Sequence, residues 1–440
     1  MTQNRPPVPA SPAYRAWVLF VLFLVYVVNF VDRQILSSLV GPIRAELGAS
    51  DFQMGLLGGL AFAVLYSIAG IPIARLADTG NRRNVVTFAL AAWSALTALC
   101  GTATSYGQLL LYRIGVGIGE AGGSAPSHAL VADYFPAAQR GRALALLATG
   151  IHVGIFVGLV TGSQFSEDWR DAFVVVGLPG LALALLVRFT VREPERGGTD
   201  AAPPPVEVPT FAETLRTLLR SPTVVLVLAG ASVAALSGYA FAFWGYEFFA
   251  RVHDLDRPTI GWSLGLATAV GGGLGTAAGG QLGDRLGLRD PRWYGFVCAA
   301  GMLATLPLGA AALYAESVPA ALAFAAAFLF AGAVYAGPMY AILQGLAPAR
   351  MRTMAAALLF LCTNLIGLGA GPPIVGALNP LLEPAAGRDA IRHSLAIVTA
   401  LNLPVAVVFV AIGRRLGRAS PAPGAPEVPA AGSARTSRRA

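Results

Sequence analysis

The segment GQLGDRLGLR occupies residues 280–289, and the segment ARLADTGNRR at residues 74–83 has a similar pattern. Each segment lies between two long apolar stretches, and each places an Asp near the end of the first stretch with Arg a few residues later. A loop that recurs at the same place in both halves of a chain indicates a six-helix unit repeated in parallel. The duplicated loop therefore predicts two related helical bundles.

Apolar runs flank both loops along most of the chain. Runs of about 20 residues, the length that crosses a bilayer as a helix, are predicted at residues 17–40, 54–77, 84–104, 107–132, 142–165, 171–190, 223–250, 259–282, 293–314, 318–345, 353–378 and 393–413. The first run is too long for a cleavable signal peptide. The sequence therefore predicts an all-α membrane protein with twelve transmembrane helices, arranged as two pseudo-symmetric six-helix bundles.

Composition and charge agree with a membrane protein. Charged residues make up 12% of the chain, against about 25% in a soluble domain. All 31 basic residues are Arg, and placing both termini in the cytoplasm puts 23 of them on the cytoplasmic side and six outside. This asymmetry predicts a multi-pass protein of the inner (plasma) membrane with cytoplasmic termini. It excludes nucleic-acid binding, because the net charge of +8 is not gathered in a basic domain.

The predicted helices divide the chain into five parts. They are a cytoplasmic N-terminal tail (1–16), a first six-helix bundle (17–192), a cytoplasmic linker with a short amphipathic helix (193–222), a second bundle (223–413) and a disordered cytoplasmic tail (414–440). The three Cys residues fall inside predicted helices, so no disulfide or metal framework is expected.

Four ionisable residues interrupt the apolar runs: Asp32 and Arg33 in the first, Arg113 and Glu120 in the fourth. Each charge costs roughly 2.5–3.5 kcal/mol at the centre of a membrane helix. Such residues usually face the bundle interior and mark a substrate or proton path. The alternative is a structural ion-pair cluster that locks the two helices together.

The depths of these residues suggest their roles. At about 1.5 Å of rise per residue, Asp32 and Arg113 lie at one level, and Glu120 lies two turns deeper, near the membrane midplane. We expect Glu120 to be the main protonation site because it is the deepest, with Asp32 as the second carboxylate and Arg113 competing for either. Arg33 is the expected ligand for a substrate phosphate or carboxylate, because its planar guanidinium binds such groups in a bidentate manner.

The duplicated loop resembles the pattern G-x-x-x-D-R-x-G-R-R of the major facilitator superfamily. The first copy departs from that pattern at Ala74, Thr79 and Asn81, and the second copy matches it more closely. The resemblance implies the major facilitator fold over nearly the whole chain. It suggests gating residues that hold the cytoplasmic side shut, namely Asp78, Arg82, Arg83, Asp284 and Arg285. The alternative is that these positive charges only determine topology.

Two further segments narrow the resemblance. NFVDRQ at 29–34 and RIGVGIGEAGGSAPSHALVADYF at 113–135 resemble the spinster-like branch, which pairs N-x-x-D-R with R-x-x-x-G-x-G-E-A. This resemblance implies export of lysophospholipids or sphingoid lipids by a monomer. It places Asn29 in the substrate-binding site with Arg33 and Arg113.

Other polar and small residues in the helices have two interpretations each. His152 lies near the depth of Glu120 and either shares a proton relay or is a hydrogen-bonded packing residue. Asn364 is a candidate polar contact for substrate, although an interhelical hydrogen bond is the favoured role. Glycines at 150, 154, 158 and 162 form a stripe that allows a neighbouring helix to approach closely.

The segment YAFAFWGYEFF at 239–249 is rich in aromatic residues. A membrane-interface belt is the favoured interpretation for Tyr239, Phe243 and Tyr246. The alternative is that they line a lipid-binding cavity or an outer gate. Glu247 is a candidate substrate ligand, or it pairs with Arg251 four residues later.

Together these features predict a secondary active transporter that works by alternating access. The expected activity is proton-coupled export, with proton antiport preferred, of an amphipathic substrate such as a lysophospholipid or a sphingoid-type lipid. The alternatives are an uncoupled lipid facilitator or scramblase, a proton-driven drug efflux pump and a non-transporting receptor. No cofactor or metal is expected, and a P-loop enzyme is excluded because the chain has no Lys.

Overall fold

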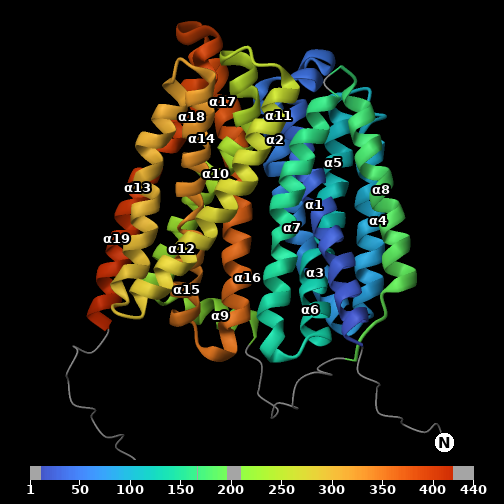
Figure 1. The fold of residues 1–440 in the computed structure, drawn as a ribbon, viewed down its shortest axis with the longest axis vertical. Coiled ribbons are helices and arrows are strands. Elements are labelled where there is room, and N and C mark those ends of the chain that lie inside the picture. The colour runs from blue at the N-terminus through green and yellow to red at the C-terminus, as the bar shows by residue number, and fades with distance from the viewer. Residues whose placement is uncertain (1–10, 166, 196–209, 420–440) are drawn as a thin grey trace, which may run out of the picture.

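A computed structural model describes residues 11–165, 167–195 and 210–419, and all regular structure within them is helical. Figure 1 shows the helices of the first half standing beside those of the second half, with the short helix α9 (Phe211–Leu219) at one end of the bundle. The predicted all-α fold is confirmed. Residues 1–10 of the predicted tail (1–16), most of the polar linker and residues 420–440 lie outside the described residues.

Every predicted run of the first half is helical. The six transmembrane helices consist of α1 (Pro12–Leu47), α2 and α3 (Asp51–Gly58 and Leu60–Thr79), α4 (Arg82–Cys100), α5 and α6 (Tyr106–Glu120 and Ser124–Tyr134), α7 (Ala137–Gln164) and α8 (Trp169–Thr190). The second helix is interrupted at Gly59, and the fourth is interrupted directly after Glu120.

The second half repeats this order. Its first three transmembrane helices are α10 (Pro222–Val252), then α11 (Arg257–Leu266), η1 (Ala267–Gly271) and α12 (Gly272–Gly287) as the second, and α13 (Arg292–Tyr314). The fourth consists of α14 (Val318–Ala333) and α15 (Ala336–Leu346), and the short η2 (Ala349–Met351) follows it. The fifth consists of α16 (Arg352–Cys362), η3 (Thr363–Leu368) and α17 (Gly369–Ala386), and after η4 (Gly387–Asp389) the sixth consists of α18 (Ala390–Ala400) and α19 (Asn402–Ala419). The second and fourth helices of this half are also interrupted, by the π-turn η1 and by residues 334–335. The second and fourth helices are therefore interrupted in both bundles, whereas the π-turn η3 interrupts the fifth helix of the second half and α7 is continuous.

Several helix ends differ from the sequence prediction. Helix α1 begins at Pro12, and α19 continues to Ala419, into the region predicted to be a disordered tail. Within the described residues, nine helical stretches have the length and composition needed to cross a membrane. One of these nine stretches, Arg352–Arg418, contains two of the predicted helices.

The ends of the bundle are named here after the predicted orientation. The outer end contains residues 48–50 and 253–256, and the inner end contains α9.

The glycine stripe of α7 determines how closely this helix packs against α1. A methyl group on Gly154 would lie 2.6 Å from Phe30 Cβ and 2.6 Å from the Val27 carbonyl oxygen, and one on Gly150 would lie 2.9 Å from Tyr26 Cβ. Real carbon atoms do not approach this closely without displacement. The predicted packing role of the stripe is confirmed, and the stripe brings the charged face of α1 to a fixed position.

We expect Gly154→Ala to lower the stability of the protein and Gly141→Ala not to do so. Overpacking of a close contact costs about 1–3 kcal/mol, whereas a methyl group on Gly141 of the same helix meets nothing within 4 Å. Thermal unfolding midpoints of the two purified variants in detergent test this. Equal midpoints would contradict the packing argument.

Candidate functional site

An ion pair between α1 and α5 forms the centre of the site. Arg33 Nε donates to Glu120 Oε2 at 2.6 Å. Glu120 is fully buried, and the Arg33 side chain keeps 17% of its surface exposed. The structure therefore brings the expected protonation site and the expected anion ligand into direct contact, so that Arg33 is the partner of Glu120.

Three aromatic rings fix the Arg33 guanidinium. Its Cζ lies 5.3 Å from the ring centroid of Phe30 and 4.8 Å from those of Phe62 and Tyr66. Rings at these distances attract a cation through their quadrupoles. Phe62 and Tyr66 were missed by the sequence prediction, although their spacing of four residues places both on one face of α3. The rings hold the charge in place and leave its terminal nitrogens for another ligand.

Asp32 and Arg113 form the buried part of the same cluster. Arg113 Nη1 donates to the backbone oxygen of Asp32 at 3.2 Å, and both residues are at most 2% exposed. Glu120 and Arg113 are close enough to the Asp32 carboxylate to interact with it electrostatically. The structure thus brings together all four of the ionisable residues singled out in the apolar runs.

Glycines explain how α5 carries these charges in a dry environment. A methyl group on Gly117 would lie 3.1 Å from the Phe62 carbonyl oxygen, and one on Gly119 would lie 2.9 Å from Trp93 Cβ. The two glycines therefore let α5 pack tightly against α3 and α4 at the level of Glu120. This is the structural reason for the spacing G-x-G-E in the sequence.

Of the other predicted substrate ligands, Tyr239 and Asn29 lie near the ion pair, whereas Asn364 bonds within its own helix. Tyr239 on α10 lies near Arg33, so the second half of the chain also borders the site. Asn29 is 4% exposed and lies beside Glu120. Asn364 Nδ2 donates to the Phe360 carbonyl oxygen of its own helix at 2.8 Å, so the expected bond of this amide to another helix is not formed.

His152 lies on the wall of a cleft between the two halves. The cleft has a volume of about 710 Å³ and a mostly apolar lining from α7, η1 and α12. The His152 ring lies 3.6 Å from the position of a methyl group on Gly273. A different histidine, which the sequence prediction missed, lies beside α1: the ring nitrogens of His128 are 3.3 Å from Tyr26 Oη.

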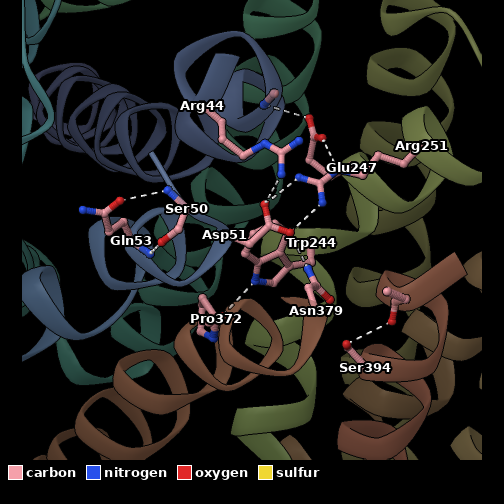
Figure 2. Close-up of polar contacts among 12 residues, drawn as sticks. Arg44, Ser50, Asp51, Gln53, Trp244, Glu247, Arg251, Pro372, Asn379 and Ser394 are labelled. Atoms are coloured by element: carbon pink, nitrogen blue, oxygen red, sulfur yellow. Dashed lines mark hydrogen bonds and ion pairs between the residues drawn. The ribbon is translucent and has the colours of Figure 1, made fainter. Parts of the chain in front are cut away.

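A second polar network closes the outer end of the bundle (Figure 2). Asp51 on α2 accepts hydrogen bonds from Arg251 Nη1 at 2.7 Å, Arg44 Nη1 at 2.9 Å and Asn379 Nδ2 at 2.8 Å. Arg251 and Asn379 belong to the second half, so Asp51 links the two bundles. We call the following residues the outer clasp: Arg44, Asp51, Glu247, Arg251, Arg257 and Asn379.

Glu247 is the other carboxylate of the outer clasp. It is 2% exposed and accepts from Arg251 Nε at 3.0 Å, Arg257 Nη1 at 3.3 Å and the Gly41 N–H at 2.9 Å. The predicted pairing of Glu247 with Arg251 is confirmed, and Glu247 also links α10 to α1.

The favoured interpretation of the aromatic segment as an interface belt is wrong. Phe243 is 7% exposed and Tyr246 is fully buried. Tyr246 Oη donates to the Arg257 carbonyl oxygen at 2.8 Å, and Phe243 packs against Trp244, whose indole N–H donates to Pro372. The rings pack inside the protein near the outer clasp, because the halves meet there and exclude lipid. This arrangement matches the alternative of an outer gate.

The expected gating residues lie at the inner end. Arg82 forms ion pairs with Asp133 and, at 2.9 Å, with Glu193, and the Arg83 backbone N–H donates to Glu193 at 2.8 Å. Asp133 belongs to the first half and Glu193 begins the linker, so in this conformation these pairs tie the linker to the first bundle and do not reach the second. Three predicted gating residues are exposed at the inner ends of their helices: Asp78, Asp284 and Arg285. Their gating role stays a prediction.

Among residues 11–165, 167–195 and 210–419, no group of three or more His, Cys, Asp or Glu side chains is placed to hold a metal ion.

Comparisons with known proteins agree with this geometry. The family model of the Major Facilitator Superfamily matches residues 22–372. An MFS-type efflux pump of Mycolicibacterium smegmatis is 34% identical over 385 residues, which cover 87% of this chain and 89% of the pump. Human protein spinster homolog 1 is 28% identical over 384 residues, with 81% of this chain and 71% of the human protein covered.

A solved structure is also similar. It is the crystal structure of a bacterial homologue of the human lysosomal transporter Spinster, in an inward-facing and unoccupied conformation. The TM-score is 0.85 at 28% identity, with 92% of this chain and 98% of that chain covered.

We expect Asp51→Arg to open the outer end and the double variant Asp51→Arg with Arg251→Asp to close it in part, because the swap restores one ion pair but leaves Arg44 and Glu247 each beside a like charge. Losing a hydrogen-bonded charge pair of this kind costs roughly 1–3 kcal/mol, which is about a fivefold to 150-fold change in the ratio of closed to open molecules. The measurement is the labelling rate of Ser37→Cys by a membrane-impermeant maleimide, in a background without the three native cysteines. Arg392→Asp, at an exterior position outside the outer clasp, is the control. An unchanged labelling rate in Asp51→Arg would refute the clasp.

Proposed function

Because the chain belongs to the major facilitator superfamily and is spinster-like, we propose that this secondary transporter couples proton movement to the export of an amphipathic molecule with a zwitterionic head group. The Arg33–Glu120 ion pair is the observation that carries the proposal. It places one cation and one anion side by side in the middle of the bundle, with only the cation partly exposed.

The ion pair supports competition between substrate and proton. A phosphate on the head group would bind Arg33 and separate it from Glu120. The buried Glu120 carboxylate would then need another partner for its negative charge. An ammonium on the same head group supplies that partner only while Glu120 is ionised. A proton on Glu120 removes the charge that the ammonium requires, so the two ligands exclude each other. Mutually exclusive binding is the condition for antiport.

The cleft supports an amphipathic substrate. Its volume of about 710 Å³ lies within the range of roughly 300–1,000 Å³ that is usual for small-molecule sites. The lining is mostly apolar, with Thr149, His152 and Thr276 as polar exceptions. In the proposed complex the head group binds Arg33 and Glu120, and the apolar chain extends along α7 and α12.

The closed outer clasp supports loading from the inner side. In the proposed cycle the substrate enters at the inner end, the halves rock about the central site, and the outer clasp separates to release it. The topology expected from the Arg distribution makes this direction export across the plasma membrane. The cycle requires a single chain, in agreement with the expected monomer.

Drug efflux is the second candidate function. The relative from Mycolicibacterium smegmatis that is 34% identical is an MFS-type efflux pump, and a cationic amphiphile would pair with Glu120 alone. An uncoupled facilitator is the remaining alternative and would use the cluster only structurally.

The decisive experiment uses the full chain in liposomes. Lysophosphatidylcholine, lysophosphatidic acid, sphingosine and ethidium are offered with and without an imposed pH gradient. We expect gradient-driven movement of lysophosphatidylcholine by the wild type. Glu120→Gln should lose the response to the gradient but keep downhill movement, because Gln cannot release a proton. Movement of ethidium in preference to the lipids would favour drug efflux, and gradient-independent movement by the wild type would favour a facilitator.

Arg33→Lys tests head-group recognition separately. Lys keeps the charge but loses the planar fork that binds a phosphate in a bidentate manner and stacks on the rings. We expect the KM for lysophosphatidylcholine to rise about tenfold, with little change for sphingosine, which has no phosphate. An equal change for both lipids would contradict a phosphate at Arg33. Arg188→Lys, outside the cluster on α8, is the matched control.

A further inference from the structure

Two buried polar side chains of α4 face the Asp32 carboxylate. Trp93 Nε1 and Thr97 Oγ1 are directed at its two buried oxygens, but neither forms a hydrogen bond of normal length and angle in this conformation. Buried polar groups are nearly always hydrogen-bonded, so this arrangement calls for an explanation. The sequence prediction names Asp32 as the second carboxylate, but the proposed function assigns it no step and does not involve α4.

One face of α4 is directed at Asp32. Trp93 and Thr97 are four residues apart, are fully buried, and both face the Asp32 carboxylate. Tight packing holds α4 in this position, because a methyl group on Gly119 would lie 2.9 Å from Trp93 Cβ and one on Gly177 would lie 2.6 Å from the Ser94 carbonyl oxygen. The polar face therefore cannot turn away from the carboxylate without disturbing α5 and α8.

The chemistry of this face suits a carboxyl group that exists in two protonation states. A Thr hydroxyl both donates and accepts, so Thr97 can donate to a carboxylate and accept from a carboxylic acid. The indole N–H of Trp93 only donates and therefore favours the ionised form. A metal cation is disfavoured here, because that N–H and the Arg113 guanidinium both present positive charge to Asp32.

We propose that Thr97 and Trp93 are positioning residues for reversible protonation of Asp32. A proton added to the Asp32 carboxylate forms a carboxylic acid that donates to Thr97, and loss of the proton reverses the direction of that bond. Trp93 holds the carboxyl plane in both states. A role in transport for the protonation of Asp32 rests on the proposed function. The protonation itself can be measured without any substrate.

Infrared spectroscopy of the purified full chain tests the proposal. The carbonyl stretch of a protonated carboxyl group is titrated between roughly pH 4 and 9, and the band lost in Asp32→Asn is assigned to Asp32. We expect Thr97→Val to move the titration midpoint of this band by about one pH unit, a tenfold change in proton affinity, and to raise its frequency. Trp93→Phe should move the midpoint upward, because a donor to the ionised form is lost.

Two further variants separate positioning from packing. Thr97→Ser keeps the hydroxyl and should retain the wild-type midpoint. Thr87→Val is the matched control, because Thr87 is buried on the same helix but its hydroxyl donates to the Arg83 carbonyl oxygen at 2.9 Å. Identical titrations of wild type and Thr97→Val, or no titrating band that depends on Asp32, would overturn the proposal. Either result is independent of whether the liposomes show gradient-driven transport.

Discussion

The need to pair charge inside a low-dielectric bundle is the constraint on which the rest of the structure depends. Two cations and two anions lie between α1, α4 and α5, where water cannot screen them. Each charge has to find its partner within the protein. This requirement fixes the rotation of α1 and α5, and it explains the close glycine contacts of α5 and α7, because only close helices bring short carboxylate side chains to the arginines.

The same constraint separates the protein into two charged layers. The central cluster of Asp32, Arg33, Arg113 and Glu120 lies within the first half, with Tyr239 of the second half at its border. The outer clasp instead connects the two halves, through Asp51 and Glu247. A cluster confined to one bundle can change its charge without breaking the contact between bundles. A clasp between bundles has to break for the outer end to open. The proposed coupling and the proposed outer gate would therefore use the same residue types at different places in the fold.

The sequence predicted the helices and the cluster well, because both have local signals. Long apolar runs define helices, and charges within them stand out, so Asp32, Arg33, Arg113 and Glu120 were found without a structure. Of the outer clasp only the Glu247–Arg251 pair was predicted. The contacts of Asp51 were missed because Asp51 follows Ser50 in an ordinary helix cap and the outer arginines resemble loop charges. No local sequence pattern indicates which charged residue forms an ion pair with which. His152 and His128 both lie in helices, and only tertiary packing decides that His128 lies beside Tyr26 on α1.

The net charge of the central cluster gives a criterion for coupling. With both carboxylates ionised, the cluster of Asp32, Arg33, Arg113 and Glu120 is neutral. One added proton leaves one arginine without a partner, which is costly in a dry site and draws in an anion. A zwitterion adds no net charge and is accepted only by the neutral cluster. A simple anion is accepted best by the protonated cluster. Under the proposed coupling, the sign therefore follows from the head group: the same four residues would support antiport of a zwitterion and symport of an anion.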